Sequence, residues 1–135
     1  MISGIRSLHF AHMSDLQIDA IVPIGERMCV KCNAITTEIK MLGNGEVNES
    51  SEMGNDQEVF TTTLTFHTHE AIELPAGRAA FFLTDMCGNT YLLGTDQRPV
   101  PVVVRNFTNP ATPTSRRGYM YTVSYTNTHG LLEIL

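Results

Sequence analysis

The stretch from Arg78 to Arg105 constrains the fold of this chain more than any other. Two apolar runs, Ala79–Leu83 and Tyr91–Leu93, flank the segment Asp-Met-Cys-Gly-Asn. Its glycine and asparagine tolerate the positive φ angles that a tight β-hairpin turn requires. A third apolar run, Val100–Val104, follows after a proline-containing connection. Short apolar runs with turn residues between them predict a β-meander.

Strand patterns continue along nearly the whole chain. The candidate strands are Ile5–Met13, Leu16–Ile24, Val30–Met41, Glu58–His69, Arg78–Thr84, Thr90–Gly94, Val100–Phe107, Tyr119–Thr126 and Leu131–Leu135. Helical periodicity is weak, and the best stretch, Phe10–Gln17, is less well supported as a helix than as strand or loop. The sequence therefore predicts one all-β domain over residues 1–135, an antiparallel sandwich or small barrel of about eight strands with little or no helix.

Two candidate strands alternate clearly between their faces. In Val59–His69 one face carries Phe60, Thr62, Leu64, Phe66 and Thr68, and the other carries Thr61, Thr63, Thr65, His67 and His69. In Tyr119–Tyr125, the residues Tyr119, Tyr121, Val123 and Tyr125 share a face. Because side chains alternate along a strand, each of these strands should have one buried face.

Two polar stretches interrupt the strand pattern and are expected to be long loops. Gly43–Gln57 is acidic and rich in glycine and asparagine, and Asn106–Gly118 contains two prolines among small polar residues. Such compositions bury little apolar surface to offset the entropy of ordering. Long loops in compact domains are often functional, so both are candidate contact regions.

The charge and the cysteines narrow the class of protein. A net charge of −5 with scattered basic residues argues against a nucleic-acid interface, which needs clustered Lys and Arg. We expect no membrane span, because no run reaches about 20 apolar residues. The N-terminal residues lack the apolar core of a signal peptide, and three cysteines form no closed disulfide set. Synthesis in a reducing, cytoplasmic environment fits these features.

Two residue pairs have the spacing of metal ligands. Cys29 and Cys32 match the CxxC pattern of a zinc site, and His67 and His69 could join them or form a site of their own. The cysteines lie in a candidate strand, where residues three apart point to opposite faces. Reduced cysteines and exposed histidines are therefore the favoured interpretation, and whether either pair binds a metal stays open.

Catalytic patterns are absent from the sequence. Asp85 is best explained as the residue that opens the hairpin turn, and Cys87 lies within that turn with no histidine adjacent in sequence. The sequence contains no phosphate-binding loop, dinucleotide fingerprint or nucleophile elbow. We therefore expect a protein that is not an enzyme and that needs no cofactor.

The segment from Asp85 to Thr95, with Gly88-Asn89 and Tyr91-Leu92-Leu93-Gly94, is followed by Arg98-Pro99 and Pro101 and by the strand Tyr119–Thr126. These residues, in the C-terminal half, resemble small all-β structural proteins from phages and prophages of gut Bacteroidetes. The resemblance implies a virion component: a head–tail connector, a tail protein or a capsid-associated protein. Such a subunit would be made in the bacterial host cytoplasm and would work in the virion.

The leading hypothesis is a non-enzymatic subunit that forms symmetric homo-oligomers and contacts other virion proteins. Its contacts are expected from the two long loops and from the two terminal strands, which would cover exposed sheet edges. The candidate contact residues are Tyr119, Tyr121, Tyr125, Arg116, Arg117, Asn48 and Glu49.

Two alternatives remain. The tyrosines Tyr119, Tyr121 and Tyr125 could form a stacking platform for a carbohydrate, which would make the protein a ligand-binding β module. A core face or its rim is the favoured interpretation of the same residues. The second alternative is a metal-dependent β-barrel enzyme that uses His67 and His69.

Overall fold

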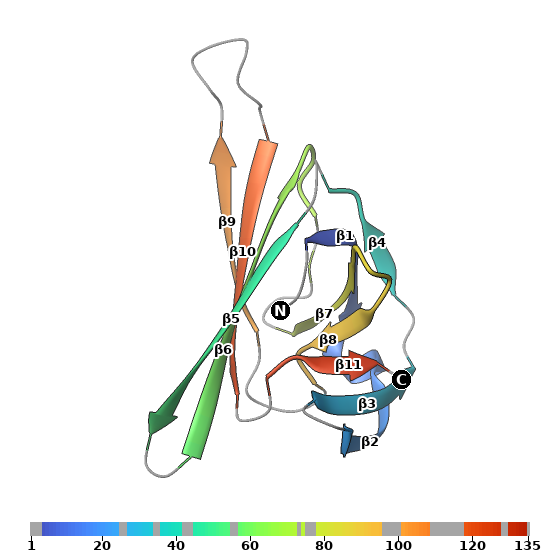
Figure 1. Cartoon of the computed structure of the whole chain (residues 1–135). Helices are drawn as coiled ribbons and strands as arrows, with labels where there is room; N and C mark the ends of the chain where they lie inside the picture. Colours follow the sequence, from blue (N-terminus) through green and yellow to red (C-terminus); the bar gives the residue numbers. More distant parts are fainter. Residues whose placement is uncertain are drawn as a thin grey trace.

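The computed structural model describes residues 4–24, 27–33, 36–41, 45–54, 57–72, 74, 78–95, 101–108, 118–127 and 130–134. Within these residues the protein is nearly all β (Figure 1). Its strands are β1 (Ile5–His12), β2 (Gln17–Ile24), β3 (Arg27–Asn33), β4 (Thr37–Ile39), β5 (Glu46–Gly54), β6 (Gln57–Thr68), β7 (Ala79–Asp85), β8 (Thr90–Leu93), β9 (Val102–Thr108), β10 (Gly118–Asn127) and β11 (Leu132–Ile134). The predicted all-β class is confirmed.

The strands form two sheets. A curled seven-stranded sheet has the order β2-β3-β11-β8-β7-β1-β4, and a four-stranded sheet has the order β5-β6-β10-β9. The sheets face each other, and the four-stranded sheet is a long twisted ribbon that projects past the other sheet (Figure 1). Within the described residues all strand pairs are antiparallel except β11 with β3. The arrangement is a sandwich in which one layer curls toward a half-barrel.

Most candidate strands coincide with observed ones. The exception among them is Val30–Met41, which divides into β3 and β4. The stretch considered for a helix, Phe10–Gln17, contains the end of β1 and a short 3-10 turn, Met13–Asp15. His12 Nδ1 accepts a hydrogen bond from the backbone N–H of Ser14 at 3.1 Å and caps this turn. Among the described residues, no helix has the length and apolar character needed to cross a membrane.

The prediction of a loop over Gly43–Gln57 was wrong, because most of that stretch is strand β5. β5 pairs with β6 without a break, from Glu46 opposite Thr65 to Gly54 opposite Gln57. Backbone hydrogen bonds to β6 hold this segment in place, so the strand needs few buried side chains. In the second expected loop, residues 106–108 belong to β9 and residue 118 begins β10. Residues 109–117 lie outside the described part of the chain.

Neither terminal strand has a free edge for the contacts expected of it. β1 lies between β7 and β4, and β11 lies between β8 and β3. Both terminal strands are therefore paired on both sides. The edges of the two sheets are instead β2, β4, β5 and β9.

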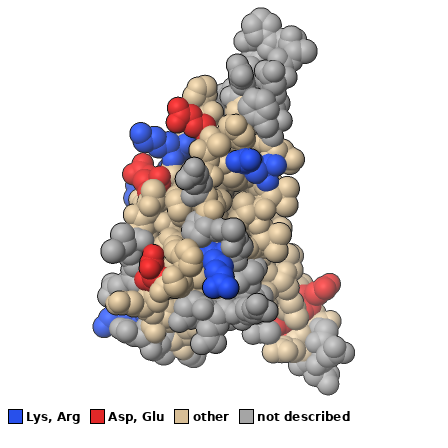
Figure 2. Space-filling view, turned by 180° about the vertical axis from the view of Figure 1, so that it is seen from behind, with Lys and Arg blue, Asp and Glu red and all other residues tan. Residues whose placement is uncertain are grey.

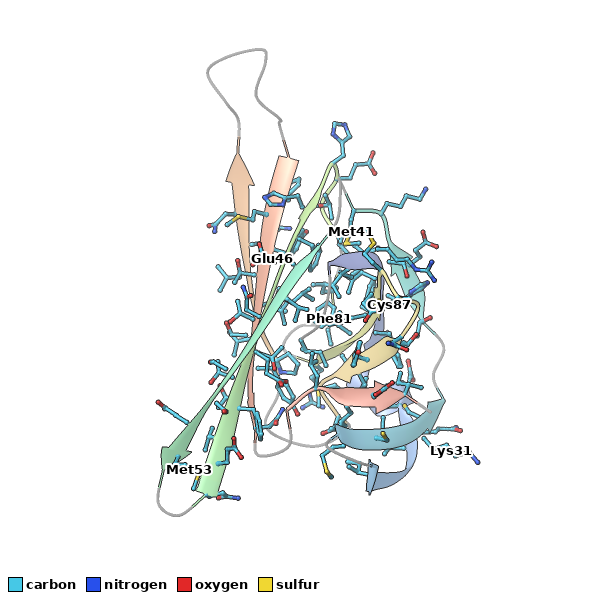
Figure 3. All side chains as sticks on the ribbon, in the orientation of Figure 1. Lys31, Met41, Glu46, Met53, Phe81 and Cys87 are labelled. Carbon is cyan, nitrogen blue, oxygen red and sulfur yellow. The ribbon has the colours of Figure 1, made fainter. Side chains whose placement is uncertain are left out.

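The main core lies between the sheets. It is made of Ile5, Leu8, Ile39, Leu64, Phe66, Ala79, Phe81, Leu83, Tyr91, Leu93, Tyr121, Val123 and Tyr125. Phe81 reaches from the seven-stranded sheet toward the other layer (Figure 3). The Phe66 ring stacks on Tyr121 at a centroid distance of 5.1 Å and lies 6.4 Å from Phe81. These aromatic contacts join the two sheets at their centre.

A second core fills the concave side of the seven-stranded sheet. Ala80, Phe82 and Leu92 from neighbouring strands pack there with Val30 and Leu132, among other residues. This explains the unbroken apolar sequence of β7: its alternate residues enter one core and then the other. A strand buried on both faces has no polar face to show.

The hairpin between β7 and β8 forms as its sequence predicts. Asp85 is buried, and its Oδ1 accepts hydrogen bonds from the N–H groups of Cys87 at 2.9 Å and Asn89 at 3.0 Å. Gly88 has φ of 91°, a conformation that costs glycine little. Asp85 is therefore a turn-forming residue, as expected.

Candidate interaction surface

One end of the four-stranded sheet is a two-stranded arm. Pairing between β10 and β6 ends at Asn127 opposite Phe60, so within the described part of the chain residues 57–59 pair with β5 alone. We call residues 51–54 and 57–59 the arm. It projects away from the seven-stranded sheet (Figure 1). Its side chains therefore lie outside both cores.

The arm is acidic and carries one exposed apolar side chain. Glu52, Gln57 and Glu58 are exposed, and Met53 is 70% exposed near the end of β5 (Figure 3). The arm sequence contains no Lys or Arg at its described positions. An isolated two-stranded hairpin is only marginally stable in water. The arm thus presents polar backbone and acidic side chains that a partner could cover.

The centre of the outer face of the four-stranded sheet, which points away from the core, is built mostly from small side chains. It carries Asn48 and Ser50 of β5, Thr61, Thr63 and Thr65 of β6, Thr122, Ser124 and Thr126 of β10, and Val102 and Val104 of β9. Thr61 and Thr126 lie opposite each other, with their Oγ1 atoms 3.5 Å apart. Val102 is 59% exposed and Val104 is 50% exposed. The result is a surface that is uncharged at its centre, with Glu46 and Glu52 on the β5 edge and two exposed valines on the β9 edge.

Of the expected contact residues, Asn48 and Glu49 lie on β5 rather than in a loop. Asn48 is exposed on the outer face. Glu49 Oε2 accepts hydrogen bonds from the Leu131 N–H at 2.8 Å and from Thr62 Oγ1 at 3.4 Å. Glu49 therefore connects β5 to the turn before β11. Arg116 and Arg117 lie outside the described residues.

The tyrosines of β10 line the core instead of a surface platform. Tyr121 and Tyr125 are 2% and 1% exposed, and Tyr119 is half-buried at the rim of the core. Arg105 lies over the Tyr119 ring at 5.3 Å. This placement matches the favoured interpretation of the stripe as a core face and its rim. The rings of Tyr121 and Tyr125 are thus not available to stack on a ligand at the surface.

The hydroxyls of the two buried tyrosines differ in their partners. Tyr121 Oη accepts a hydrogen bond of 2.8 Å from the backbone N–H of Ile72. Among the described residues, Tyr125 Oη has no hydrogen bond of good geometry, although the Asn127 and Thr95 side chains lie near it. Burial raises the pKa of Tyr125 above 10.0, and these two side chains partly offset the effect.

We expect Tyr121→Phe and Tyr125→Phe to differ in stability. Tyr121→Phe leaves the Ile72 N–H without its partner and should lower the free energy of unfolding by about 1 kcal/mol. Tyr125→Phe removes a buried hydroxyl that lacks a good partner, so it should cause no loss. Urea unfolding at neutral pH measures both. An equal loss in the two variants would contradict these hydroxyl assignments.

Tyr125 also predicts how stability depends on alkaline pH. Its folded-state pKa is raised, so the protein binds this proton more tightly when folded than when unfolded. The resulting stability is fully present below the unfolded pKa of 10.0 and is lost as the pH rises through the folded-state pKa. Above pH 10.0 the protein should therefore lose free energy of unfolding relative to Tyr125→Phe, which has no ionisable hydroxyl at this position. A difference that stays constant with pH would contradict the prediction.

The candidate metal ligands do not gather in the described structure. His67 is exposed on the outer face of β6, and His69 is exposed just after that strand. Cys29 is buried on β3, whereas Cys32 on the same strand packs against the second core. Within the described ranges no three His, Cys, Asp or Glu side chains form a group that could hold a metal ion. Metal binding stays a hypothesis for both pairs.

Charges on the visible surface are mixed. Figure 2 shows the face opposite to the view of Figure 1, where basic and acidic side chains lie scattered among uncharged ones. On the two edge strands of the four-stranded sheet, acidic and basic side chains lie on different strands. The described ionisable side chains of β5 are Glu46, Glu49 and Glu52, whereas Arg105 is the ionisable residue of β9.

Sequence reasoning missed the two edge strands as a surface. The sequence pattern predicts contacts in loops and terminal strands, and it shows the valines of β9 only as part of a strand. The signal was present in Val102–Val104, three β-branched residues in a row with a polar continuation. Only the strand order shows that this run lies at an edge.

Comparisons with known proteins do not add a family. No protein-family model matches the chain, and no curated protein or solved structure matches it.

Proposed function

We propose that the protein is a non-enzymatic assembly subunit that forms symmetric homo-oligomers. The observation that carries this proposal is the four-stranded sheet, which has two open edges and an arm that extends beyond the body. Contacts come from this sheet, not from the terminal strands, which are paired on both sides.

Physical reasoning supports an assembly role. A free sheet edge carries unpaired N–H and C=O groups that a neighbouring strand can bond. The arm adds further exposed backbone on both of its sides. An enzyme or small-ligand module would gain little from such a projecting ribbon, whereas a subunit of a shell or ring gains contact area.

The resemblance of the C-terminal half to phage and prophage structural proteins suggests where such a subunit works. On that basis we propose a virion component, such as a head–tail connector, a tail protein or a capsid-associated protein, made in the bacterial host cytoplasm. Its partners would be further copies of itself and other virion proteins. Contacts with nucleic acid or membrane are not part of the proposal.

The solution mass of the purified protein tests this function. Light scattering across a concentration series should give a defined multiple of 15.0 kDa, and electron microscopy of the same peak should show rings, tubes or another closed particle. A single chain at every concentration would overturn self-assembly.

Shortening the arm tests its share in assembly. Deleting Glu52, Met53, Glu58 and Val59 removes two facing pairs and keeps Ser51 opposite Phe60 and Gly54 opposite Gln57. Because pairs are removed in twos, the remaining side chains keep their faces. We expect the free energy of unfolding to change by less than about 1 kcal/mol, since these residues lie outside both cores. The oligomer should weaken, and unchanged assembly would remove the arm from the contact surface.

A further inference from the structure

The four edge strands differ in how they resist pairing with another chain. β4 has only three residues. β2 contains Pro23, which lacks a backbone N–H, and its register shifts between Ile18 and Ala20. Short length, proline and irregular register are devices that protect sheet edges. The two edges of the seven-stranded sheet are therefore poor sites for a neighbouring strand.

β9 has none of these protections. Its pairing with β10 is regular from Thr108 opposite Gly118 to Val102 opposite Ser124. Within its seven residues it contains no proline or lysine. Two of its three valines are exposed: Val102 at 59% and Val104 at 50%. A regular, open edge with an apolar run such as Val102–Val104 is the kind of edge to which another strand adds.

β5 is an open edge of a different character. It is nine residues long, regular along its whole length, and carries three glutamates. Like charges along an edge hinder pairing with an identical strand. The same charges do not hinder pairing with a strand of opposite charge.

We propose that β9 of one copy pairs antiparallel with β5 of the next copy, so that the four-stranded sheets join into one continuous sheet. This inference rests on the proposed assembly function and specifies the contact. It assigns one donor edge and one acceptor edge to each subunit.

Strand direction supports this pairing. The order β5-β6-β10-β9 alternates strictly, because all three pairs in the sheet are antiparallel. With an even number of alternating strands, the two outer strands run in opposite directions. Two sheets placed side by side with the same face to the core therefore bring β9 and β5 together as antiparallel neighbours.

Charge selects this pairing over the other two combinations. Pairing β9 with β9 would bring two copies of Arg105 onto one interface, and pairing β5 with β5 would bring six glutamates together. Pairing β9 with β5 places Arg105 on the same face of the joined sheet as Glu49, because both residues lie on the core-facing side. Glu46 and Glu52 lie on the outer face, which they share with the uncharged Val102 and Val104. Like charges across strands destabilise a sheet and opposite charges stabilise it.

The contact uses different surfaces on its two sides. Such head-to-tail contacts close into a ring when the rotation between subunits divides a full turn, and otherwise continue as a filament. The continuous sheet would place the threonine-rich outer faces of all copies on one side. The seven-stranded sheets would lie on the other side.

Two edge variants test the contact. In the β9 variant, Val102→Glu and Val104→Glu add negative charge opposite the acidic strand at two exposed positions. In the β5 variant, Glu46→Lys, Asn48→Lys and Glu52→Lys reverse the charge of that edge and leave Glu49 in place. The matched control is Thr122→Glu with Ser124→Glu, because these residues lie opposite Val104 and Val102 on the same face of the inner strand β10. Circular dichroism and thermal melting verify that each variant folds.

Light scattering gives the outcomes. We expect each edge variant alone to fall to the mass of one chain, 15.0 kDa, while the control keeps the mass of the unmodified oligomer. An equimolar mixture of the two edge variants should associate again, because each supplies the edge that the other lacks.

Other results overturn the inference in distinguishable ways. A β5 variant that keeps its oligomer while the β9 variant loses it would show β9–β9 pairing. Oligomers that survive in both folded variants would show a contact elsewhere and leave the assembly function standing. An unmodified protein that stays a single chain would overturn both the contact and the assembly function.

Discussion

Phe66→Asp is expected to unfold the protein. Phe66 is fully buried between the sheets, stacked on Tyr121 and beside Phe81. Removing a buried phenylalanine side chain costs about 3–5 kcal/mol, and burying a carboxylate without a partner adds several more. The sum approaches or exceeds the total stability of about 5–15 kcal/mol that is usual for a domain. Far-ultraviolet circular dichroism and limited proteolysis of the variant should show an unfolded chain.

His67→Asp is the matched control for this prediction. His67 is the next residue of the same strand, but it is exposed on the outer face. The substitution should change the free energy of unfolding by about 1 kcal/mol or less, mainly through the lower strand preference of aspartate. Loss of structure in both variants would contradict the register of β6, because a shift of one residue would exchange their faces.

This contrast was available from the sequence, because alternation alone assigns the faces of β6 and β10. The same is true of the hairpin after β7, where Asp85 and Gly88 have the roles that their chemistry predicts. These features are local. They depend on residues two to five apart, and the sequence shows them directly.

The sequence could not predict β5, because pairing with the neighbouring strand β6 is what makes this segment a strand. Glu46–Gly54 has few apolar residues and a composition typical of loops. It is a strand because β6 is long enough to offer it a complete ladder. Strand preference is strongly dependent on context, so a polar segment becomes a strand when its partner is fixed. The candidate contact residues Asn48 and Glu49 thus lie on a sheet edge, not in a loop.

The division of the strands into two sheets could not be predicted from the sequence either. Pairings such as β11 with β3 join residues about a hundred positions apart, and nothing local records them. The same holds for the identity of the edges. The sequence predicted contacts from two long loops and the two terminal strands, but β1 and β11 are interior strands, and the edges of the sheets are β2, β4, β5 and β9. A candidate interaction surface that depends on strand order can be identified only from the structure.

Gly130→Ala is expected to destabilise the protein strongly. Gly130 is buried in the turn before β11 and has φ of 73°, where an alanine is strained by about 1–2 kcal/mol. A Cβ there would lie 2.9 Å from Glu49 Oε2 and 3.4 Å from Phe60 Cγ. The Glu49 side chain would have to move away and release the Leu131 N–H. Together these effects should lower the free energy of unfolding by about 2–4 kcal/mol, measured by urea denaturation.

A double-mutant cycle separates the backbone strain from the displaced carboxylate. Glu49→Ala removes the acceptor of the Leu131 N–H without changing the backbone of the turn. If Gly130→Ala acts partly by displacing Glu49, the double variant should lose about 1–2 kcal/mol less than the two single losses added together. Strict additivity would show that Glu49 does not hold this turn. In that case β5 would be connected to the body chiefly through its pairing with β6, and Glu49 would be free to contact a neighbouring subunit.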